Sequence, residues 1–183
     1  MAPIFDLDGY RCGELPDTAW RATHPRSQTQ LTRTDGLVAA DTTLDIFRRW
    51  QLKRAVANHL NINSTHPSCF VSVFEDKECA VNWAKNRGPH DEVFITEIDL
   101  NKVTDDIYVF DAAWLAEELD TWSRGLPGEL LFLYHVPQQL VKETRSLREV
   151  YEQGVYAPVY GSSPDILTNR HVKRLYPTCV FRV

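Results

Sequence analysis

Cys69-Phe-Val-Ser-Val-Phe74 is the stretch of the sequence that decides the fold. Its large and β-branched apolar side chains are typical of a buried strand rather than of a surface loop. In residues 75–85, which follow, alanine and valine recur at helical spacing, and Gly88-Pro89 ends that pattern. The sequence therefore predicts a buried strand that leads directly into a helix.

Further strands and helices are predicted on both sides of this unit. Apolar or alternating side chains predict strands at residues 18–23, 92–100, 108–110 and 129–136. Helical spacing predicts a helix from Thr42 or Thr43 to Leu60 and another over residues 112–122, the second with Trp114, Leu115 and Leu119 facing inward. Residues from Gln138 onward are expected to turn helical before short elements that end at Val183. Strands and helices interleave without the glycine-rich turn of a dinucleotide-binding Rossmann unit, so we expect a mixed α+β fold.

Length and composition favour one domain in a cytoplasmic location. The chain has 183 residues, of which 43% are hydrophobic, enough for a single core. A net charge of -5 argues against a surface that coats DNA. The first ten residues lack a secretory signal pattern, and no run reaches the roughly 18 apolar residues of a membrane span. The four cysteines form no Cys-x-x-Cys pair and are expected to be reduced.

Three polar residues, Arg21, Ser72 and Glu129, stand where the neighbouring pattern is apolar. A buried guanidinium costs several kcal/mol unless a carboxylate or a phosphate pairs with it. A small hydroxyl can hold a carboxylate or contact a ligand, and a carboxylate at a cleft can stabilise an oxocarbenium-like transition state. Taken singly, each residue is also explained by a structural role: an ion-paired arginine, a serine bonded to the backbone and a solvated glutamate.

Taken in order, the three segments resemble the Arg, Ser, Glu signature of ADP-ribosyltransferases, particularly the toxin-like and pierisin-like branch. Trp20-Arg-Ala22, followed by Pro25-Arg26, is similar to the first strand of that family. Residues 70–74, with the helix that follows, resemble its serine strand and helix. Residues 129–141 resemble its glutamate-led strand with the Ile-Pro sequence that closes it.

This resemblance implies a split β-sheet core with flanking helices over residues 18–143. An irregular lead-in (1–17) and a C-terminal extension (144–183) complete a single domain over residues 1–183. The resemblance also implies that Arg21 grips the diphosphate of NAD, that Ser72 orients Glu129, and that Glu129 stabilises the ribosyl cation as nicotinamide leaves.

The resemblance therefore predicts a transferase that takes NAD as its substrate. The acceptor stays open, because Pro127 stands where the family has the Glu or Gln that helps to select it. The residues beside the three motifs are expected to bind the small-molecule substrate: Trp20, His24, Arg26, Phe74, Tyr134 and His135.

A second resemblance is to fungal arginine-containing cyclodipeptide synthases, which draw amino acids from aminoacyl-tRNA. In such an enzyme Glu129 or Tyr134 would deprotonate the attacking α-amine, and His135 would assist. A tRNA partner would bind along the basic strip of the first predicted helix, which a solvated helix face explains as well. That strip consists of Arg48, Arg49, Lys53 and Arg54. The candidates for an acidic guanidinium pocket are Glu97, Asp99, Glu117 and Glu118.

A third reading is a non-enzymatic ligand or partner module, because a fold alone does not determine function. Metal catalysis is not expected under any of the three readings. The six histidines show no His-x-x-x-His or His-Glu-x-x-His spacing, so the sequence predicts no metal cofactor.

Overall fold

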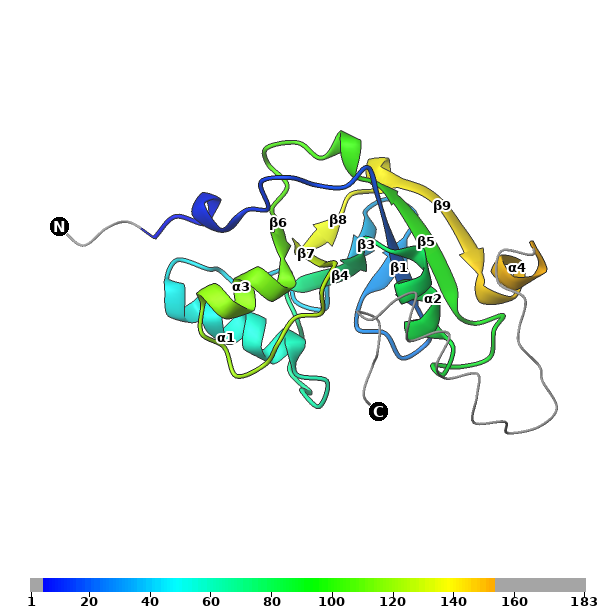
Figure 1. Ribbon diagram of the computed structural model, residues 1–183, viewed down its shortest axis with the longest axis horizontal. Coiled ribbons are helices and arrows are strands. Elements are labelled where there is room, and N and C mark those ends of the chain that lie inside the picture. Colours follow the sequence, from blue (N-terminus) through cyan, green and yellow to red (C-terminus); the bar gives the residue numbers. More distant parts are fainter. Residues whose placement is uncertain (1–4, 154–183) are drawn as a thin grey trace, which may run out of the picture.

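A six-stranded antiparallel sheet forms the centre of the molecule in a computed structural model that describes residues 5–153 (Figure 1). Its strand order is β6-β7-β4-β1-β5-β9. The strands are β1 (Thr18–Thr23), β4 (Phe70–Phe74), β5 (Phe94–Asp99), β6 (Val109–Asp111), β7 (Glu129–Leu133) and β9 (Val141–Ser146). The chain is thus a mixed α+β domain, as predicted.

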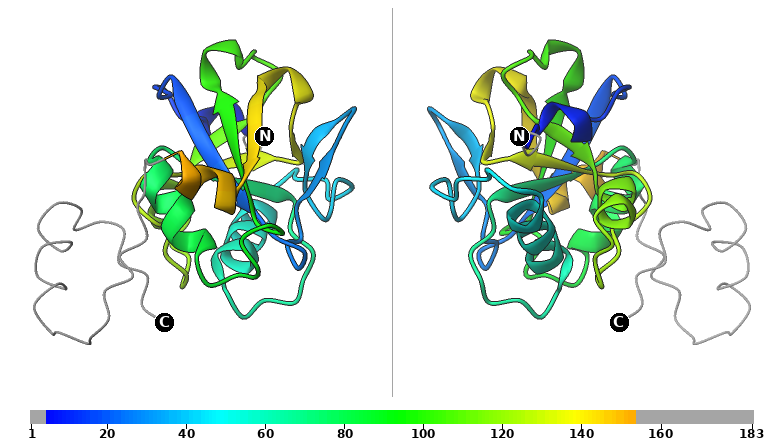
Figure 2. Two further views of the ribbon diagram at one scale, coloured as in Figure 1. Left: turned by 90° about the vertical axis from the view of Figure 1, so that its right-hand side faces the viewer. Right: turned by 90° about the vertical axis from the view of Figure 1, so that its left-hand side faces the viewer.

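A second, three-stranded sheet packs against one face of the first. It consists of β2 (Gln30–Thr32), β3 (Gly36–Val38) and β8 (His135–Val136). Figure 2 shows it on the side opposite to α2 and α4. Gly36 has a φ of 82°, and a Cβ there would lie 2.1 Å from the carbonyl oxygen of Val136. Only glycine therefore allows β3 to approach β8 so closely. The short 3-10 helices are η1 (Asp8–Tyr10), which precedes β1, and η2 (Leu100–Lys102) and η3 (Gln138–Leu140), which each follow a strand.

Two pairs of helices cover the other face, one pair over each half of the large sheet (Figure 1). Helices α1 (Arg49–Leu60) and α3 (Ala112–Glu118) pack on β4, β6 and β7. Helices α2 (Lys77–Ala84) and α4 (Leu147–Glu152) pack on β1 and β5. Side-chain caps start three of them, because Asp76, Asp111 and Ser146 each accept a hydrogen bond from a backbone N–H in the first turn.

The large sheet is split between its two central strands. β1 pairs with β5 along its whole length and β4 pairs with β7 along its whole length. Between β1 and β4 the pairing is confined to Trp20 opposite Phe74. The two strands therefore diverge beyond this pair, and the backbone groups of β4 that face β1 need other partners.

The predicted strand at residues 129–136 is interrupted at Tyr134. This residue has a φ of 65°, its N–H donates to the carbonyl of Cys69 (2.7 Å), and its hydroxyl donates to the carbonyl of Leu44 (2.6 Å). These bonds hold a conformation that is uncommon outside glycine. The chain consequently leaves the large sheet after Leu133, and His135 belongs to the second sheet.

The helix predicted from Thr42 or Thr43 begins only at Arg49. The carboxylate of Asp41 accepts hydrogen bonds from both the N–H and the hydroxyl of Thr43, each at 2.8 Å. Such a local turn competes with helical hydrogen bonding. Residues 42–48 therefore precede the helix without regular secondary structure.

Several smaller expectations also need correction. Leu115 and Leu119 are buried as predicted, whereas Trp114 is 45% exposed. Beyond Gln138 only η3 is helical before β9, and the predicted core boundary at residue 143 falls inside that strand. The short elements predicted to end at Val183 lie outside the described residues.

The cysteines differ from one another. Cys12 and Cys69 are free thiols, as expected. Cys79 is disulfide-bonded, so the expectation of four reduced cysteines is wrong at this position.

Candidate functional site

The side chain of Arg21 lies in the split between β1 and β4. Its Nη1 donates to the carbonyl oxygen of Ser72 (2.7 Å), which β1 would have bonded had the sheet continued, and its Nη2 donates to the hydroxyl of Thr29 (3.2 Å). Its Nε is buried and has no hydrogen-bond partner among the described residues. Loss of hydration lowers the pKa of Arg21 to about 10, although the charge of Glu129 opposes this shift.

Ser72, on β4, is 7% exposed and contacts a histidine that the sequence did not single out. The Nε2 atom of His59, near the end of α1, lies 2.6 Å from the Ser72 hydroxyl. The other ring nitrogen, Nδ1, lies 2.6 Å from the hydroxyl of Ser68. Burial, and then the positive charge of Arg21, lower the pKa of His59 to about 3. The imidazole is consequently neutral at physiological pH.

Glu129 begins β7, opposite Phe74, and is also 7% exposed. The backbone N–H of Leu126 donates to its Oε2 (3.1 Å). Burial raises the pKa of Glu129, while hydrogen bonds from Leu126 and from the Ser72 side chain, together with the charge of Arg21, act to lower it. The opposed influences identify a carboxyl that is both desolvated and held by donors.

The sequence-predicted triad therefore meets in one place. Arg21 bonds the backbone carbonyl of Ser72, and hydrogen bonding from the Ser72 side chain acts to lower the pKa of Glu129. Strand order explains the meeting, because β1, β4 and β7 are neighbours in the sheet. His59 completes the cluster from the helix that covers it, and we call these four residues the split-sheet cluster.

Positive charge gathers at the end of β1 beside the cluster. The indole of Trp83 has the guanidinium of Arg87 4.3 Å from its ring centre, that of Arg21 at 6.0 Å, and the ring of His24 at 5.5 Å. Burial is the largest cause of a lowered pKa at His24, followed by the charges of Arg87, Arg21 and Arg26. Within residues 5–153 none of these three arginines forms an ion pair. The arrangement can attract an anion.

Of the other predicted substrate-binding residues, Phe74 borders the split, opposite Trp20 on β1 and Glu129 on β7. Phe74 is 4% exposed and packs against Cys79 and Ala80, which leaves little surface for a ligand. The hydroxyl of Tyr134 is bonded to a backbone carbonyl. His135 is exposed on β8, where it pairs with Val38.

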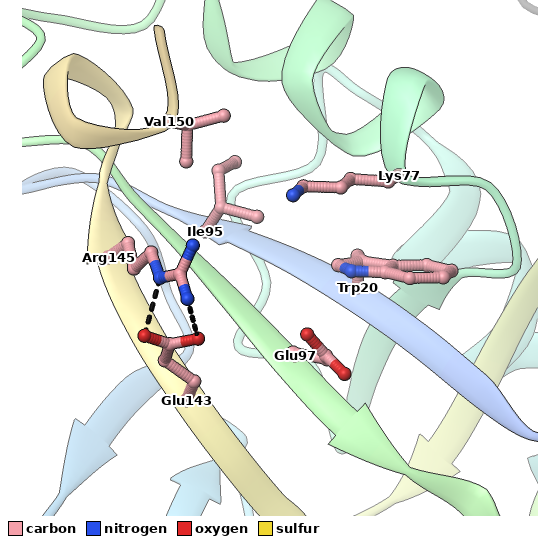
Figure 3. A pocket seen from close by; sticks show the side chains of 7 residues that line it. All are labelled: Trp20, Lys77, Ile95, Glu97, Glu143, Arg145 and Val150. Atoms are coloured by element: carbon pink, nitrogen blue, oxygen red, sulfur yellow. Dashed lines mark hydrogen bonds and ion pairs between the residues drawn. The ribbon is translucent and has the colours of Figure 1, made fainter. Parts of the chain in front are cut away.

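Trp20 lines a shallow depression over β1, β5 and β9, on the face covered by α2 and α4 (Figure 3). The depression encloses about 250 Å³, including space open to solvent. Its other lining residues are Lys77, Ile95, Glu97, Glu143, Arg145 and Val150. Glu143 pairs with Arg145, as the dashed lines in Figure 3 show, and Glu97 pairs with Lys142 at 3.1 Å. The negative charge of each carboxylate is therefore already balanced by a neighbouring cation within the protein.

Half of the basic strip on α1 is engaged within the protein. Arg49 pairs with Glu118 and Lys53 with Asp120, each at 3.5 Å. The guanidinium of Arg54 lies 5.4 Å from the ring centre of Trp50. The strip thus ties α1 to α3 as well as facing solvent.

His59 is the residue of the cluster that sequence reasoning missed. Helical spacing in the sequence aligns it with Leu52 and Val56 on the apolar side of the predicted helix, where an imidazole packs as a core side chain. That position contained the signal, because a histidine on a buried face needs hydrogen-bond partners. The identity of those partners, Ser68 and Ser72, follows only from the packing of α1 on β4.

Two further observations concern the described part of the chain. Within it, no three His, Cys, Asp or Glu side chains are grouped so that they could hold a metal ion. No helix there is long and apolar enough to cross a membrane.

Together these features define a mixed α+β domain with a buried polar cluster in the split of its central sheet. Residues 14–150 match the family model described as "Domain of unknown function (DUF7587)". The chain therefore belongs to this family. No curated protein matches the chain.

Proposed function

We propose that the protein is a transferase that moves the ADP-ribosyl group of NAD to an acceptor at the split-sheet cluster. The observation that carries this proposal is the meeting of Arg21, Ser72 and Glu129 between β1, β4 and β7. The same three residues carry the resemblance of the sequence to the Arg, Ser, Glu signature. The proposal places the activity in the cytoplasm.

The arginines at the end of β1 suit the donor's diphosphate. The guanidinium of Arg21 is largely desolvated, its Nε has no partner among the described residues, and it forms no ion pair there. A phosphate oxygen would supply the missing acceptor and charge. Arg26 and Arg87 add positive charge beside it, and Trp83 offers an aromatic surface.

Glu129 suits the departure of nicotinamide. The bond between the ribose C1′ and the nicotinamide nitrogen breaks, nicotinamide leaves as a neutral molecule, and positive charge develops on the ribose. An ionised Glu129, with Ser72 and Leu126 as donors, would stabilise that charge. The acceptor then bonds to C1′ and releases its proton to solvent.

A second candidate is peptide-bond formation from aminoacyl-tRNA, as in the cyclodipeptide synthases. The observation that favours it is the raised pKa of Glu129, whose largest cause is burial. A carboxylate with a raised pKa is a better general base toward an attacking α-amine. Arg48 and Arg54, which form no ion pair among the described residues, would contact the RNA backbone.

A divided incubation of the purified protein tests both candidates. One half receives NAD with a cell lysate and the other receives charged tRNA, and mass spectrometry identifies the products. We expect nicotinamide and an ADP-ribosylated acceptor from the first half. A dipeptide from the second half would replace the proposal with the second candidate, and no product from either would favour a non-enzymatic module.

A further inference from the structure

Four groups, from the Phe70 backbone N–H to the Ser72 hydroxyl, form a continuous hydrogen-bonded chain that leads toward Glu129. The backbone N–H of Phe70 donates to the Ser68 hydroxyl oxygen at 3.0 Å. The Ser68 hydroxyl meets Nδ1 of His59, and Nε2 of His59 meets the Ser72 hydroxyl, both at 2.6 Å. Hydrogen bonding from the Ser72 side chain in turn acts to lower the pKa of the Glu129 carboxyl. The direction of each hydrogen bond depends on which ring nitrogen of His59 carries the hydrogen.

Hydrogen on Nε2 satisfies every group in the chain. The Ser68 hydroxyl then donates to Nδ1, and Nε2–H donates to the oxygen of Ser72. The Ser72 hydroxyl already accepts from the ring, so its own hydrogen is free to point at the Glu129 carboxylate. Every hydrogen in the chain then has an acceptor, and the carboxylate gains a hydrogen bond.

With the hydrogen on Nδ1 instead, the Ser68 hydroxyl has only a weak acceptor and the Glu129 carboxylate loses a donor. The Ser68 hydroxyl would then accept from both the ring and the Phe70 N–H, and its own hydrogen would find only the carbonyl of Phe70, at 3.5 Å. The Ser72 hydroxyl would donate to Nε2 and would turn its hydrogen away from Glu129. A buried carboxylate that loses a donor is destabilised. The geometry therefore favours the Nε2–H form.

We infer that His59 is a positioning residue whose Nε2–H fixes the Ser72 hydroxyl so that it donates to Glu129. The effect of this contact on turnover rests on the proposed function, but the contact itself does not. Because His59 acts through Ser72, its loss should lower kcat and leave KM unchanged.

The charges around the cluster keep the imidazole a fixed donor. The charge that acts on His59 is that of Arg21, from β1, and it opposes protonation, as burial does. At the other end of the chain the charges that act on Glu129 are those of Arg21 and of Asp111, which caps α3. His59 consequently stays neutral across the physiological range and does not serve as an acid or a base.

The first experiment needs neither a variant nor turnover. Nitrogen-15 NMR of the wild-type histidine rings distinguishes a protonated Nε2 from a protonated Nδ1 and follows both with pH. We expect His59 in the Nε2–H form from pH 5 to pH 8. A dominant Nδ1–H form, or an imidazolium at pH 6, would overturn the inference whatever the enzyme transfers.

The second experiment is a double-mutant cycle on kcat with His59→Leu, His59→Gln and Ser72→Ala. We expect His59→Leu to lower kcat about tenfold and His59→Gln, which keeps an N–H near Nε2, to restore most of it. In the Ser72→Ala background His59→Leu should change kcat less than about twofold. His66→Leu, on an exposed loop, is the matched control. Additive losses would mean that His59 acts other than through Ser72.

The two experiments separate the inference from the proposed function. An Nε2–H form in a protein that transfers nothing from NAD would leave the positioning contact in place and remove the ADP-ribosyl transfer. An Nδ1–H form in an active transferase would do the opposite. If His59→Leu does not fold, His59→Gln and the wild-type spectrum still decide the question.

Discussion

Charged side chains are paired with opposite charges in the depression over β1, β5 and β9, but they are desolvated and unpaired in the split-sheet cluster. In the depression, Glu97 and Glu143 are partly exposed and each pairs with a cation. In the cluster, Arg21 and Glu129 are desolvated and form no ion pair, and the pKa of each is shifted toward its neutral form by burial. Folding gains little from such an arrangement. Perturbed, incompletely compensated groups beside one another are typical of functional sites, whereas paired surface charges are not.

Replacing the carboxylates of the two regions should give the largest contrast. Glu129→Gln is expected to lower transferase activity by about 100-fold or more, because it removes the negative charge that stabilises the ribosyl cation. Its melting temperature should stay within a few degrees of the wild type, since an amide occupies the same space. Product formation from NAD and a melting curve measure the two effects.

The matched control is Glu143→Gln in the depression. It removes a carboxylate from a partly exposed ion pair and should change neither activity nor stability beyond experimental error. If Glu143→Gln inactivates the protein while Glu129→Gln does not, the site lies in the depression.

Replacing the arginines should separate binding from stability. Arg21→Met is expected to weaken NAD binding by about tenfold to 100-fold, the effect of losing a charge-assisted contact to phosphate. Its stability should be close to that of the wild type, because the lost hydrogen bonds to Ser72 and Thr29 are offset by removal of a desolvated charge. Calorimetric titration with NAD and thermal unfolding check both parts.

Arg145→Met supplies the comparison for that variant. Its guanidinium pairs with Glu143 at the depression, so NAD affinity should not change. A large loss of stability in Arg21→Met, with unchanged NAD affinity, would show that Arg21 has a purely structural role.

The pH dependence of stability should show a smaller effect that originates in the cluster. His59 has a folded pKa of about 3 against an ordinary value of 6.5, so between these values the unfolded chain binds more protons. Stability should therefore fall as pH drops from about 6.5 toward 3, by at most about 1.4 kcal/mol per pH unit for this one group. The raised pKa of Glu129 acts in the opposite sense, because the stability it contributes is lost as pH rises above its ordinary value of 4.5.

Urea unfolding of the wild type and of His59→Gln at several pH values measures this contribution. The variant should show a shallower decrease in acid than the wild type, and His66→Gln should not differ from it. Parallel curves for His59→Gln and the wild type would mean that His59 is protonated in the folded protein.

The sequence alone is sufficient to predict a candidate site residue when the signal is a polar residue within its own apolar strand. Arg21 and Ser72 each interrupt an apolar strand and Glu129 begins one, and the neighbouring places of these strands in the sheet bring the three residues together. The sequence is insufficient to predict features that depend on how distant segments of the chain pack together. The start of α1 follows from the bonds of Asp41 and Tyr134, and the role of His59 follows from the position of that helix over β4.

The two outer strands of the large sheet also bear on how the protein avoids self-association. A free strand edge offers unpaired backbone groups to another chain, and charged side chains or short length discourage such pairing. β9 carries three charged residues, Lys142, Glu143 and Arg145, and β6 spans only Val109–Asp111. Neither edge therefore presents a long apolar template. The charged side chains of β9 have no role in the proposed reaction, but they discourage pairing of this strand with another chain.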